Sequence, residues 1–485
     1  MRVQESALSE VFDAAIIGGG VVGCAIARRL TLEGWRVVLV EKAHDILDGA
    51  SKGNSAILHT GFDAPTGSLE ARCIADGYAE YRSIHQRLGL PLIEAGALVL
   101  AWTEQEEARL DALIDRAHAN GVDDVARLDV GQIRQLEPEL ANDVVAGFRV
   151  PGEHLLDPWS TPYAYLLHAV ENGAVVLRRC MVRDGEFDGT QWRLETSRGS
   201  LRARFVINAA GLYGDRVDKA LTGSSDFTIR PRKGQFVVFD KPAARLVKHI
   251  LLPVPTETTK GIVVCRTAFG NLLVGPTAEE QEDRSTAAVD TETLQGLRRA
   301  GERILPALAG EDATAFYAGL RPATDEKDYQ IRADRARNYI TAGGIRSTGL
   351  SAALGLARHI HRLCEAFGGK AEPLADPVWP RVGNISEGAP RGWQSPRNGG
   401  VVCHCELVTR REIEEALDGP LGACSLAGLK RRTRVTMGRC QGFYCMAQLA
   451  AITAGRFTQP MAGDDGLPIA SSSSTREPAE AADVT

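Results

Sequence analysis

The chain has 485 residues, which is too long for one small core and predicts two or three domains. Its 44% hydrophobic and 24% charged residues are typical of a globular protein, and the net charge of −6 argues against binding to nucleic acid or an anionic membrane. The N-terminus lacks a signal-peptide core, and no apolar stretch is long enough to span a membrane. We therefore expect a cytoplasmic protein that meets the inner membrane, if at all, through a partner.

A glycine-rich turn near the N-terminus carries the strongest signal. An apolar run over 14–17 predicts a buried strand, and a helical pattern follows over 21–33. Between them lie three glycines in the spacing Gly-x-Gly-x-x-Gly: Gly18, Gly20 and Gly23. The first permits the tight turn, the second lets a pyrophosphate approach the backbone, and the third lets helix and strand pack closely. The pyrophosphate would bind at the positive N-terminal end of the helix.

A second apolar run over 37–40 ends in Glu41. An acid about twenty residues after the last glycine is where the hydroxyl groups of a ribose need an acceptor. Strand, glycines, helix, second strand and acid fall in one unit of about 30 residues. The sequence therefore predicts dinucleotide binding.

The segment 48–62 after this acid is polar and rich in small residues, so its backbone can run close to a cofactor. Ser51 and Ser55 could donate to phosphate, and the alternative is a surface loop with ordinary turns. The glycine turn, the Glu41-Lys pair and Ala-Ser-x-x-Asn-Ser-x-x-x-His-x-Gly over 50–61 together resemble the flavoprotein family of glycerol-3-phosphate, L-2-hydroxyglutarate and D-amino-acid oxidoreductases. The resemblance implies that the dinucleotide is FAD. It places four residues along its phosphates and flavin: Ser51, Asn54, Ser55 and His59.

Further along the chain we expect a strand over 92–102, an amphipathic helix over 103–120 and a helix from about 157 to 172. A strand over 205–208 then ends in a turn of small residues that includes Ala210 and Gly211, which the family has near the FAD. The β-rich sequence around 229–277, with a helix over 291–304, predicts a sheet domain inserted in the dinucleotide fold.

The motif Gly-Leu-Arg-Pro contains Arg321, which could be an exposed turn charge. In the family an arginine at this place grips the anionic end of the substrate, and arginine suits bidentate recognition of phosphate or carboxylate. A strand, a glycine turn and a helix over 351–366 complete the first domain. By resemblance this turn brings its backbone against the cofactor at Gly344, Gly349 and Leu350.

Five of the ten cysteines are scattered, and most of them we expect to be buried free thiols. Four others form two close pairs: Cys403 with Cys405, and Cys440 with Cys445. Four thiolates so arranged suit a tetrahedral zinc ion or a [2Fe–2S] cluster, and zinc more often uses Cys-x2-Cys pairs. The segment resembles the [2Fe–2S] domain of bacterioferritin-associated ferredoxins and, more closely, the C-terminal domain of the A subunits of anaerobic glycerol-3-phosphate dehydrogenases.

Cys424 lies between the pairs without a close partner, and we leave it out of the ligand set. The basic run over 430–434 could be a solvated helix face, could offset a negative cluster, or could guide an acidic electron carrier.

Together these features predict an α/β protein: a Rossmann-type FAD-binding domain with an inserted β-sheet substrate domain, followed by a small helical [2Fe–2S] domain. The expected boundaries are 11–90, 150–228 and 330–370 for the FAD-binding domain, 91–149 and 229–329 for the substrate domain, 371–399 for a linker, 400–456 for the [2Fe–2S] domain and 457–485 for a disordered tail.

The resemblance implies a dehydrogenase that moves a hydride from a small anionic alcohol to FAD, with single electrons leaving through the cluster to an acceptor protein or partner subunit, as in a hetero-oligomer. His59 is the candidate base for the hydroxyl proton, or else packs against the cofactor. Gly-Leu-Arg-Pro favours glycerol 3-phosphate. The pattern Pro-x-x-Ser-Leu-x-Ala-Arg over 65–72, and the lack of an arginine soon after Gly61, favour a 2-hydroxy or amino acid. A non-catalytic electron-transfer subunit and a zinc-stabilised regulatory protein are the alternatives of other classes.

Overall fold

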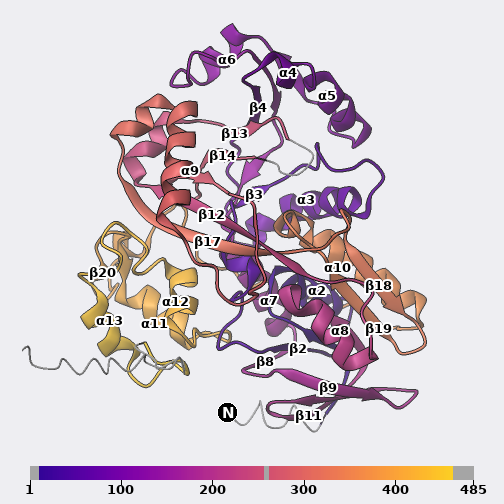
Figure 1. Cartoon of the computed structure of the whole chain (residues 1–485). Helices are drawn as coiled ribbons and strands as arrows, with labels where there is room; N and C mark the ends of the chain where they lie inside the picture. The colour runs from indigo at the N-terminus through magenta and orange to yellow at the C-terminus, as the bar shows by residue number, and fades with distance from the viewer. Residues whose placement is uncertain (1–9, 256–260, 462–485) are drawn as a thin grey trace, which may run out of the picture.

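The computed structural model describes residues 10–255 and 261–461. The predicted disordered tail lies outside this range from residue 462 onward. No helix within these ranges is long and apolar enough to cross a membrane. Two large sheets and a small C-terminal domain, coloured yellow, lie against one another (Figure 1).

The first sheet has eight strands in the described part of the chain, and we call the part built on it the main domain. Five strands run parallel in the order β8-β2-β1-β11-β19, while β18 and the β9-β10 pair are antiparallel to their neighbours. The bounds are β1 (Val11–Ile17), β2 (Val37–Glu41), β8 (Val175–Arg178), β9 (Val182–Phe187), β10 (Trp192–Thr196), β11 (Gly199–Asn208), β18 (Gln330–Asp334) and β19 (Tyr339–Gly343).

Helices cover one face of this sheet, and the β9-β10 pair with a further helix covers the other. The first group is α2 (Val21–Leu32), α3 (Leu69–Leu88), α7 (Ser160–Glu171) and α10 (Gly349–Ala366), and the further helix is α8 (Gly214–Thr222). Alternate residues of β1 serve the two cores: Ile16 packs under the helices and Ile17 on the opposite side. A parallel sheet covered on both faces explains why these strands are apolar runs rather than alternating ones.

The register brings the carboxyl ends of the central strands to one edge. Ile17 lies beside both Val40 and Asn208, and Asn208 beside Thr341. The residues that follow these ends, Gly18 and Glu41 among them, therefore meet at the edge where open α/β sheets bind their ligands.

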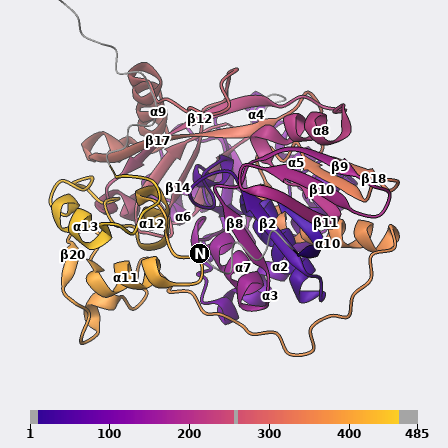
Figure 2. The ribbon, with the colours of Figure 1, turned by 90° about the horizontal axis from the view of Figure 1, so that it is seen from below.

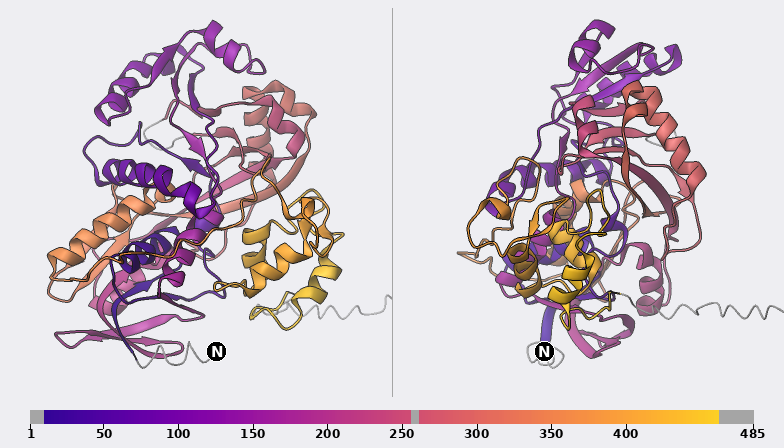
Figure 3. Two further views of the ribbon diagram at one scale, coloured as in Figure 1. Left: turned by 180° about the vertical axis from the view of Figure 1, so that it is seen from behind. Right: turned by 90° about the vertical axis from the view of Figure 1, so that its left-hand side faces the viewer.

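The second sheet has nine strands in the described ranges and is joined from two distant segments, since β4 pairs in parallel with β13. We call it, with its helices, the cap domain; it lies above the main domain in Figure 3. Its strands are β4 (Ala97–Ala101), β5 (Ala126–Leu128), β6 (Ala146–Val150), β12 (Arg230–Phe239), β13 (Ile250–Pro253), β14 (Val263–Arg266), β15 (Leu272–Gly275), β16 (Glu279–Glu280) and β17 (Ala313–Ala323). Its helices are α4 (Glu104–Glu107), α5 (Leu110–Ala119), α6 (Val130–Leu136) and α9 (Thr291–Ile304).

The predicted helix over 103–120 is two helices, α4 and α5. The first turn has no buried residue, whereas Leu110 is fully buried and begins the apolar face that packs on the sheet. Thr103 caps the first turn as expected, accepting from the Glu106 N–H at 3.2 Å. The break lets the apolar helix take its own angle on the sheet.

Residues 371–399 lack long elements and run along the main domain to the C-terminal domain (Figure 2). The segment is held in several places. Val378 and Asn172 exchange two hydrogen bonds of 2.8 Å, the Val382 N–H donates to Leu88 at 2.9 Å, and the ring of Trp379 lies under the guanidinium of Arg87 at 3.7 Å. The linker is therefore a packed strap rather than a free tether.

The C-terminal domain consists of a small hairpin and three helices: β20 (Val401–Cys403), β21 (Val408–Thr409), α11 (Arg410–Asp418), α12 (Leu426–Thr433) and α13 (Met446–Thr453). Thr409 begins α11 with a capping box closed by Glu412. The domain has its own apolar core, against which Phe457 and Met461 also pack. Its packed part therefore runs beyond the predicted boundary at 456.

The basic run over 430–434 holds this domain to the main domain. Arg432 forms a two-pronged ion pair of 2.8 and 3.0 Å with Asp45, which is 1% exposed, and Arg178 lies 3.5 Å from the same carboxylate. Arg431 donates to the main-chain oxygen of Ile46 at 2.9 Å. Arg434 pairs with Glu406 inside the domain. Three of the four basic residues are thus committed to buried contacts, and the solvated helix face allowed by the sequence is wrong.

We predict that Asp45→Asn undocks the C-terminal domain, because it leaves the buried guanidinium of Arg432 without a counter-charge. Breaking one partner of a buried pair costs about 3–5 kcal/mol. Thermal unfolding and proteolysis of the linker measure the effect. Glu414→Gln, which removes an exposed pair with Arg410, is the matched control and should cost under about 0.5 kcal/mol.

The same interface should weaken in acid. Burial alone would raise the pKa of Asp45, but Arg432 and Arg178 more than offset this and hold its pKa below the ordinary value. A depressed folded-state pKa stabilises the folded form above the ordinary pKa, and this contribution disappears as the pH falls through the depressed value. Wild-type docking should therefore weaken below about pH 4, a loss missing from Asp45→Asn; an identical acid profile for both proteins would contradict this.

Candidate functional site

The turn after β1 shows why each glycine stands where it does. Gly18 has φ = +112°, and a Cβ there would lie 2.5 Å from the main-chain oxygen of Ala209. A Cβ on Gly23 would lie 2.0 Å from the oxygen of Gly18. Gly20 is different, because its backbone is extended and a Cβ would meet only the Ser51 hydroxyl at 3.2 Å. The chain itself does not require glycine at this position, so the close approach of a ligand remains as the reason for it.

The N-terminus of α2 needs an acceptor. The helix begins at Val21 without a side-chain cap from its own N-cap residue. The Val21 N–H instead donates to the hydroxyl of Ser51 at 3.0 Å, from a loop thirty residues further on. An oxygen is thus held at the positive end of the helix, where a phosphate oxygen is also favoured. The structure brings the predicted phosphate residue Ser51 to the predicted phosphate site.

Glu41 ends β2 beside the same turn. Its two carboxylate oxygens accept from the Gly19 N–H at 2.6 Å and from the Ala43 N–H at 2.8 Å. Burial raises the pKa of Glu41, and these two N–H groups act in the opposite direction. Each oxygen keeps a lone pair after one bond, so the carboxylate can still accept from the hydroxyl groups of a ribose.

The remaining predicted cofactor residues surround this edge. The Asn54 side chain stabilises its loop: it donates to the main-chain oxygen of Ser51 and accepts from the Ala56 N–H. Ser55 is the next residue in this loop. The Cα of Ala210 would lie 3.1 Å from a Cβ on Gly18, and Gly211 follows with φ = +53°. Gly349 and Leu350 begin α10, and a Cβ on Gly349 would lie 3.9 Å from the Val21 side chain, so the N-termini of α2 and α10 adjoin. Gly344 closes its turn against Gln330 instead.

His59 follows β3 (Ile57–Leu58), which pairs with β7 (His154–Leu155) so that Leu58 lies opposite His154. One residue beyond this ladder, His59 and Glu153 meet through their side chains: the Glu153 carboxylate lies 2.8 Å from His59 Nδ1. The main-chain N–H of His59 donates to Ser351 Oγ at 2.9 Å, in the first turn of α10. His59 is therefore fixed at both its backbone and its ring. Sequence analysis missed Glu153, because a two-residue ladder leaves no periodic signal.

Arg321 lies on β17, directly opposite Arg232 of β12. Arg232 is paired with Glu280, whereas Arg321 donates only to the main-chain oxygen of Thr277, at 3.3 Å, and has no carboxylate partner in the described residues. Burial, and then Arg232, lower the pKa of Arg321 to about 10, so it remains charged at neutral pH. A partly buried guanidinium without a carboxylate partner in the described residues is a suitable place for an anion to bind.

Side chains alternate between the two faces of β17, and this shows which face carries Arg321. Tyr317, Gly319 and Arg321 share one face of the strand. The Tyr317 hydroxyl donates to Asn54 at 2.7 Å, and a Cβ on Gly319 would lie 2.6 Å from the oxygen of Gly53. The face that carries Arg321 therefore covers the loop of Ser51 and Asn54.

The four paired cysteines meet in the C-terminal domain. Cys405 lies beside Cys440, and Cys403 beside Cys445, so each pair takes one thiol from each arm. N–H groups of the loop 442–444, that of Tyr444 foremost, lower the pKa of Cys440. No three metal-binding side chains in the described ranges surround a point for a single ion. Two pairs suit two irons better than one zinc, which needs all four thiolates around it.

The loop between Cys440 and Cys445 is exposed. Phe443 and Tyr444 are 82% and 77% exposed and contact each other edge to face at 5.1 Å. Cys405 and Cys440 are the partly exposed members of the four, while Cys403 and Cys445 are buried. The open side of the cysteine site therefore carries two aromatic rings.

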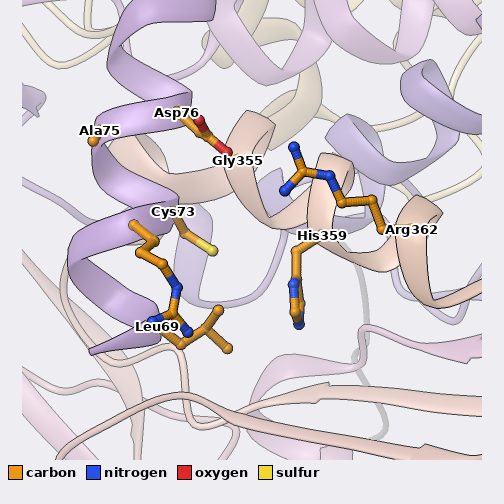
Figure 4. Close-up of a pocket in the computed structure, with 8 residues that line it drawn as sticks. Leu69, Cys73, Ala75, Asp76, Gly355, His359 and Arg362 are labelled. Atoms are coloured by element: carbon orange, nitrogen blue, oxygen red, sulfur yellow. The ribbon is translucent and has the colours of Figure 1, made fainter. Parts of the chain in front are cut away.

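A hollow of about 360 Å³ lies between α3 and α10 and contains Arg72, His359 and Arg362 (Figure 4). Burial, and then the two arginines, lower the pKa of His359. The hollow begins more than one turn along α10 from Ser351, and no predicted site residue lines it. We assign it no part in the chemistry.

Comparison with known families agrees with both sites. Residues 13–363 match the FAD dependent oxidoreductase family, and residues 401–454 match the BFD-like [2Fe-2S] binding domain. The chain therefore belongs to the FAD-dependent oxidoreductases and carries a [2Fe–2S]-binding domain at its C-terminal end. FAD and a [2Fe–2S] cluster are its cofactors.

Among individual proteins, the chain is 32% identical to a glycerol 3-phosphate dehydrogenase of Caloramator mitchellensis, over 92% of this chain and 94% of that protein. It is 28% identical to the A subunit of the anaerobic glycerol-3-phosphate dehydrogenase of Escherichia coli, over 93% of this chain and 89% of that protein. The FAD-bound L-alpha-glycerophosphate oxidase of Mycoplasma pneumoniae superimposes with a TM-score of 0.73 at 28% identity, covering 79% of this chain and all of the oxidase.

We predict that Gly20→Val yields a folded protein without FAD. In the protein itself a Cβ there would press only on the Ser51 hydroxyl at 3.2 Å, which a small shift relieves, whereas a pyrophosphate against the backbone would leave it no space. Flavin absorbance per chain and circular dichroism measure the two properties. Gly23→Val is the contrasting variant and should misfold, since its Cβ would overlap the oxygen of Gly18. Normal flavin content in Gly20→Val would disprove the assignment.

The four paired cysteines are our proposed cluster ligands. Cys445→Ser should lose the cluster and keep FAD, because the FAD site lies at the edge of the first sheet. Cys424→Ser should keep both, since its thiol only contacts the oxygen of Gly422. Iron content of about two per chain and the EPR signal of the reduced protein report the cluster. A Cys445→Ser protein with full iron content would rule out this ligand set.

Proposed function

We propose that the protein is an FAD-dependent dehydrogenase of glycerol 3-phosphate or a closely similar anionic alcohol, and that a partner protein receives its electrons through the [2Fe–2S] cluster. The observation that carries the proposal is Arg321, a partly buried cation without a carboxylate partner in the described residues, on the strand face that covers the cofactor loop. Two planar N–H edges suit a phosphate or carboxylate. The named relatives support glycerol 3-phosphate.

The chemistry assigns one task to each residue. Arg321 binds the anionic end of the substrate and so orients the carbon that bears the hydroxyl group. His59 takes the hydroxyl proton as general base. FAD, when bound, supplies the acceptor for the hydride from that carbon. The residues of this chain thus bind, orient and deprotonate the alcohol.

A 2-hydroxy acid substrate loses part of its support. The pattern over 65–72 that favoured it begins α3: Ser68 accepts from the Ala71 N–H at 3.0 Å, and Arg72 donates to the oxygen of Gly67 at 2.8 Å. Asp328 accepts from the N–H groups of the same first turn. Capping explains these residues without a substrate. The carboxylate alternative therefore rests on the lack of an arginine soon after Gly61 and on Arg321, which does not distinguish carboxylate from phosphate.

A purely electron-relaying protein would need neither an unpaired Arg321 nor a fixed His59. The two alternatives differ in one assay, the anaerobic bleaching of the flavin by small molecules added to the isolated chain. We expect glycerol 3-phosphate to bleach it fastest among glycerol 3-phosphate, 2-hydroxy acids and amino acids. Bleaching by none of them would favour the relay.

The partner's place follows from exposure. The matches to the two dehydrogenases cover 92% and 93% of this chain, so they must extend into the C-terminal domain. The match to the oxidase covers 79% of it. We associate the C-terminal domain with transfer of electrons to a protein. Phe443 and Tyr444, beside the open cysteines, are the contact surface we propose for that partner.

We predict that Arg321→Ala loses about 10- to 150-fold in kcat/KM, as expected for a lost charge-assisted contact worth about 1.5–3 kcal/mol. FAD content should not change, because the arginine serves the substrate. Arg321→Lys should recover only part, since it keeps the charge without the planar fork. Arg230→Ala, which removes an exposed pair between the start of β12 and Asp325 just after β17, is the control and should be near wild type. Flavin reduction at the wild-type rate in Arg321→Ala, with every anionic substrate, would disprove the role.

A further inference from the structure

We propose that Glu153 is the positioning residue that fixes the tautomer of His59 and strengthens it as a base. The inference rests on the proposed function, because that function gives His59 its role. Glu153 is fully buried and comes from a different part of the chain, the turn that precedes β7. Its carboxylate hydrogen-bonds to the His59 ring.

The hydrogen bonds define which atoms donate. Oε1 of Glu153 accepts from the Thr60 N–H at 2.7 Å and from the Thr60 hydroxyl at 2.8 Å, while Oε2 lies 2.8 Å from His59 Nδ1. A main-chain N–H can only donate, so Oε1 is an acceptor. A carboxylate with both oxygens accepting places the proton of the neutral imidazole on Nδ1. Nε2 is then the nitrogen with the free lone pair.

His59 is then a base with one defined accepting nitrogen, Nε2. The alcohol proton passes to Nε2, and FAD, when bound, would supply the acceptor for the hydride of the carbon that bears the hydroxyl group. The balance is a carbonyl product and a His59 imidazolium. That cation forms 2.8 Å from the buried Glu153 carboxylate. An opposite charge at this distance favours the protonated ring, so the carboxylate both orients His59 and assists the proton transfer.

Other ionisable groups near this turn do not replace Glu153. The Tyr78 hydroxyl donates to the oxygen of Gly152 at 2.8 Å, and its pKa is raised by burial and, more weakly, by Glu153. Burial lowers the pKa of His154, whose ring stacks on Tyr78. In the described ranges only His59 and Thr60 hydrogen-bond to the Glu153 carboxylate. The charged and titratable groups to consider in any pH profile are Tyr78, Arg82, Glu94, Asp124 and His154.

The first experiment needs no substrate. In the FAD-loaded wild type with ring-labelled histidine, 15N NMR should show that the neutral His59 ring carries its proton on Nδ1. The signals of His59 are identified by their absence from the spectrum of His59→Asn. In Glu153→Gln the neutral ring should become a mixture of the two tautomers, because an amide can either accept from Nδ1 or donate to it. A wild-type ring protonated on Nε2 would overturn the inference even if the glutamine variant failed to fold.

The second experiment follows the flavin. Glu153→Gln should keep its FAD, reduce it with glycerol 3-phosphate about 100- to 10,000-fold more slowly, and shift the midpoint of the pH–rate profile downward. Thr60→Val removes a neighbouring bond to Glu153 but leaves the His59 contact, and should keep the wild-type midpoint. An unchanged rate and midpoint in Glu153→Gln would refute the positioning role while leaving the proposed function intact. A wild type that no anionic alcohol reduces would instead refute the proposed function.

Discussion

The arrangement of the molecule depends on one buried ion pair, between Asp45 and Arg432. Asp45 follows Glu41 by four residues, so the acid that docks the C-terminal domain belongs to the same loop that begins at the FAD site. Electron transfer between two cofactors depends on their separation, which a flexible tether would not fix. A buried pair is a poor source of stability compared with apolar packing, but it specifies one orientation. We read Asp45 and Arg432 as the device that sets the relation between the two cofactors.

The strand β17 connects the cysteine loop and the cofactor loop with Arg321. β17 accepts a hydrogen bond of 3.2 Å from Gln441, in the cysteine loop, at Thr314. Its Tyr317 then contacts the Asn54 loop, and its Arg321 has no carboxylate partner among residues 10–255 and 261–461. Arg439, next to Cys440, pairs with Asp240 at 2.8 Å beside the same sheet. Because strands are stiff, the cluster loop, the cofactor loop and Arg321 share one frame, and none can move far alone.

Local patterns account for what the sequence could predict. The roles of Gly18 and Gly23 follow from a turn contained in about ten residues, and the cysteines from their spacing. The long-range contacts had no such signal: His59 and Glu153 are joined by a short ladder, and Asp45 and Arg432 lie at opposite ends of the chain. The basic run over 430–434 shows the limit clearly. Charge alone cannot tell a solvated face from a buried one, and here burial depends on an acid far away in the sequence.

The exposure of Phe443 and Tyr444 bears on whether the electrons go to oxygen or to a macromolecular acceptor. An enzyme that delivers electrons to oxygen needs only a path for a small molecule to the flavin, and bare aromatic rings beside the cysteines would serve no purpose there. The rings are costly to leave in water and lie beside the partly exposed Cys440, where a macromolecule can reach the site. Two rings cover far less area than a stable interface of about 800 Å² per partner needs. They are better suited to a brief redox encounter, or to one part of a larger interface, than to holding a partner on their own.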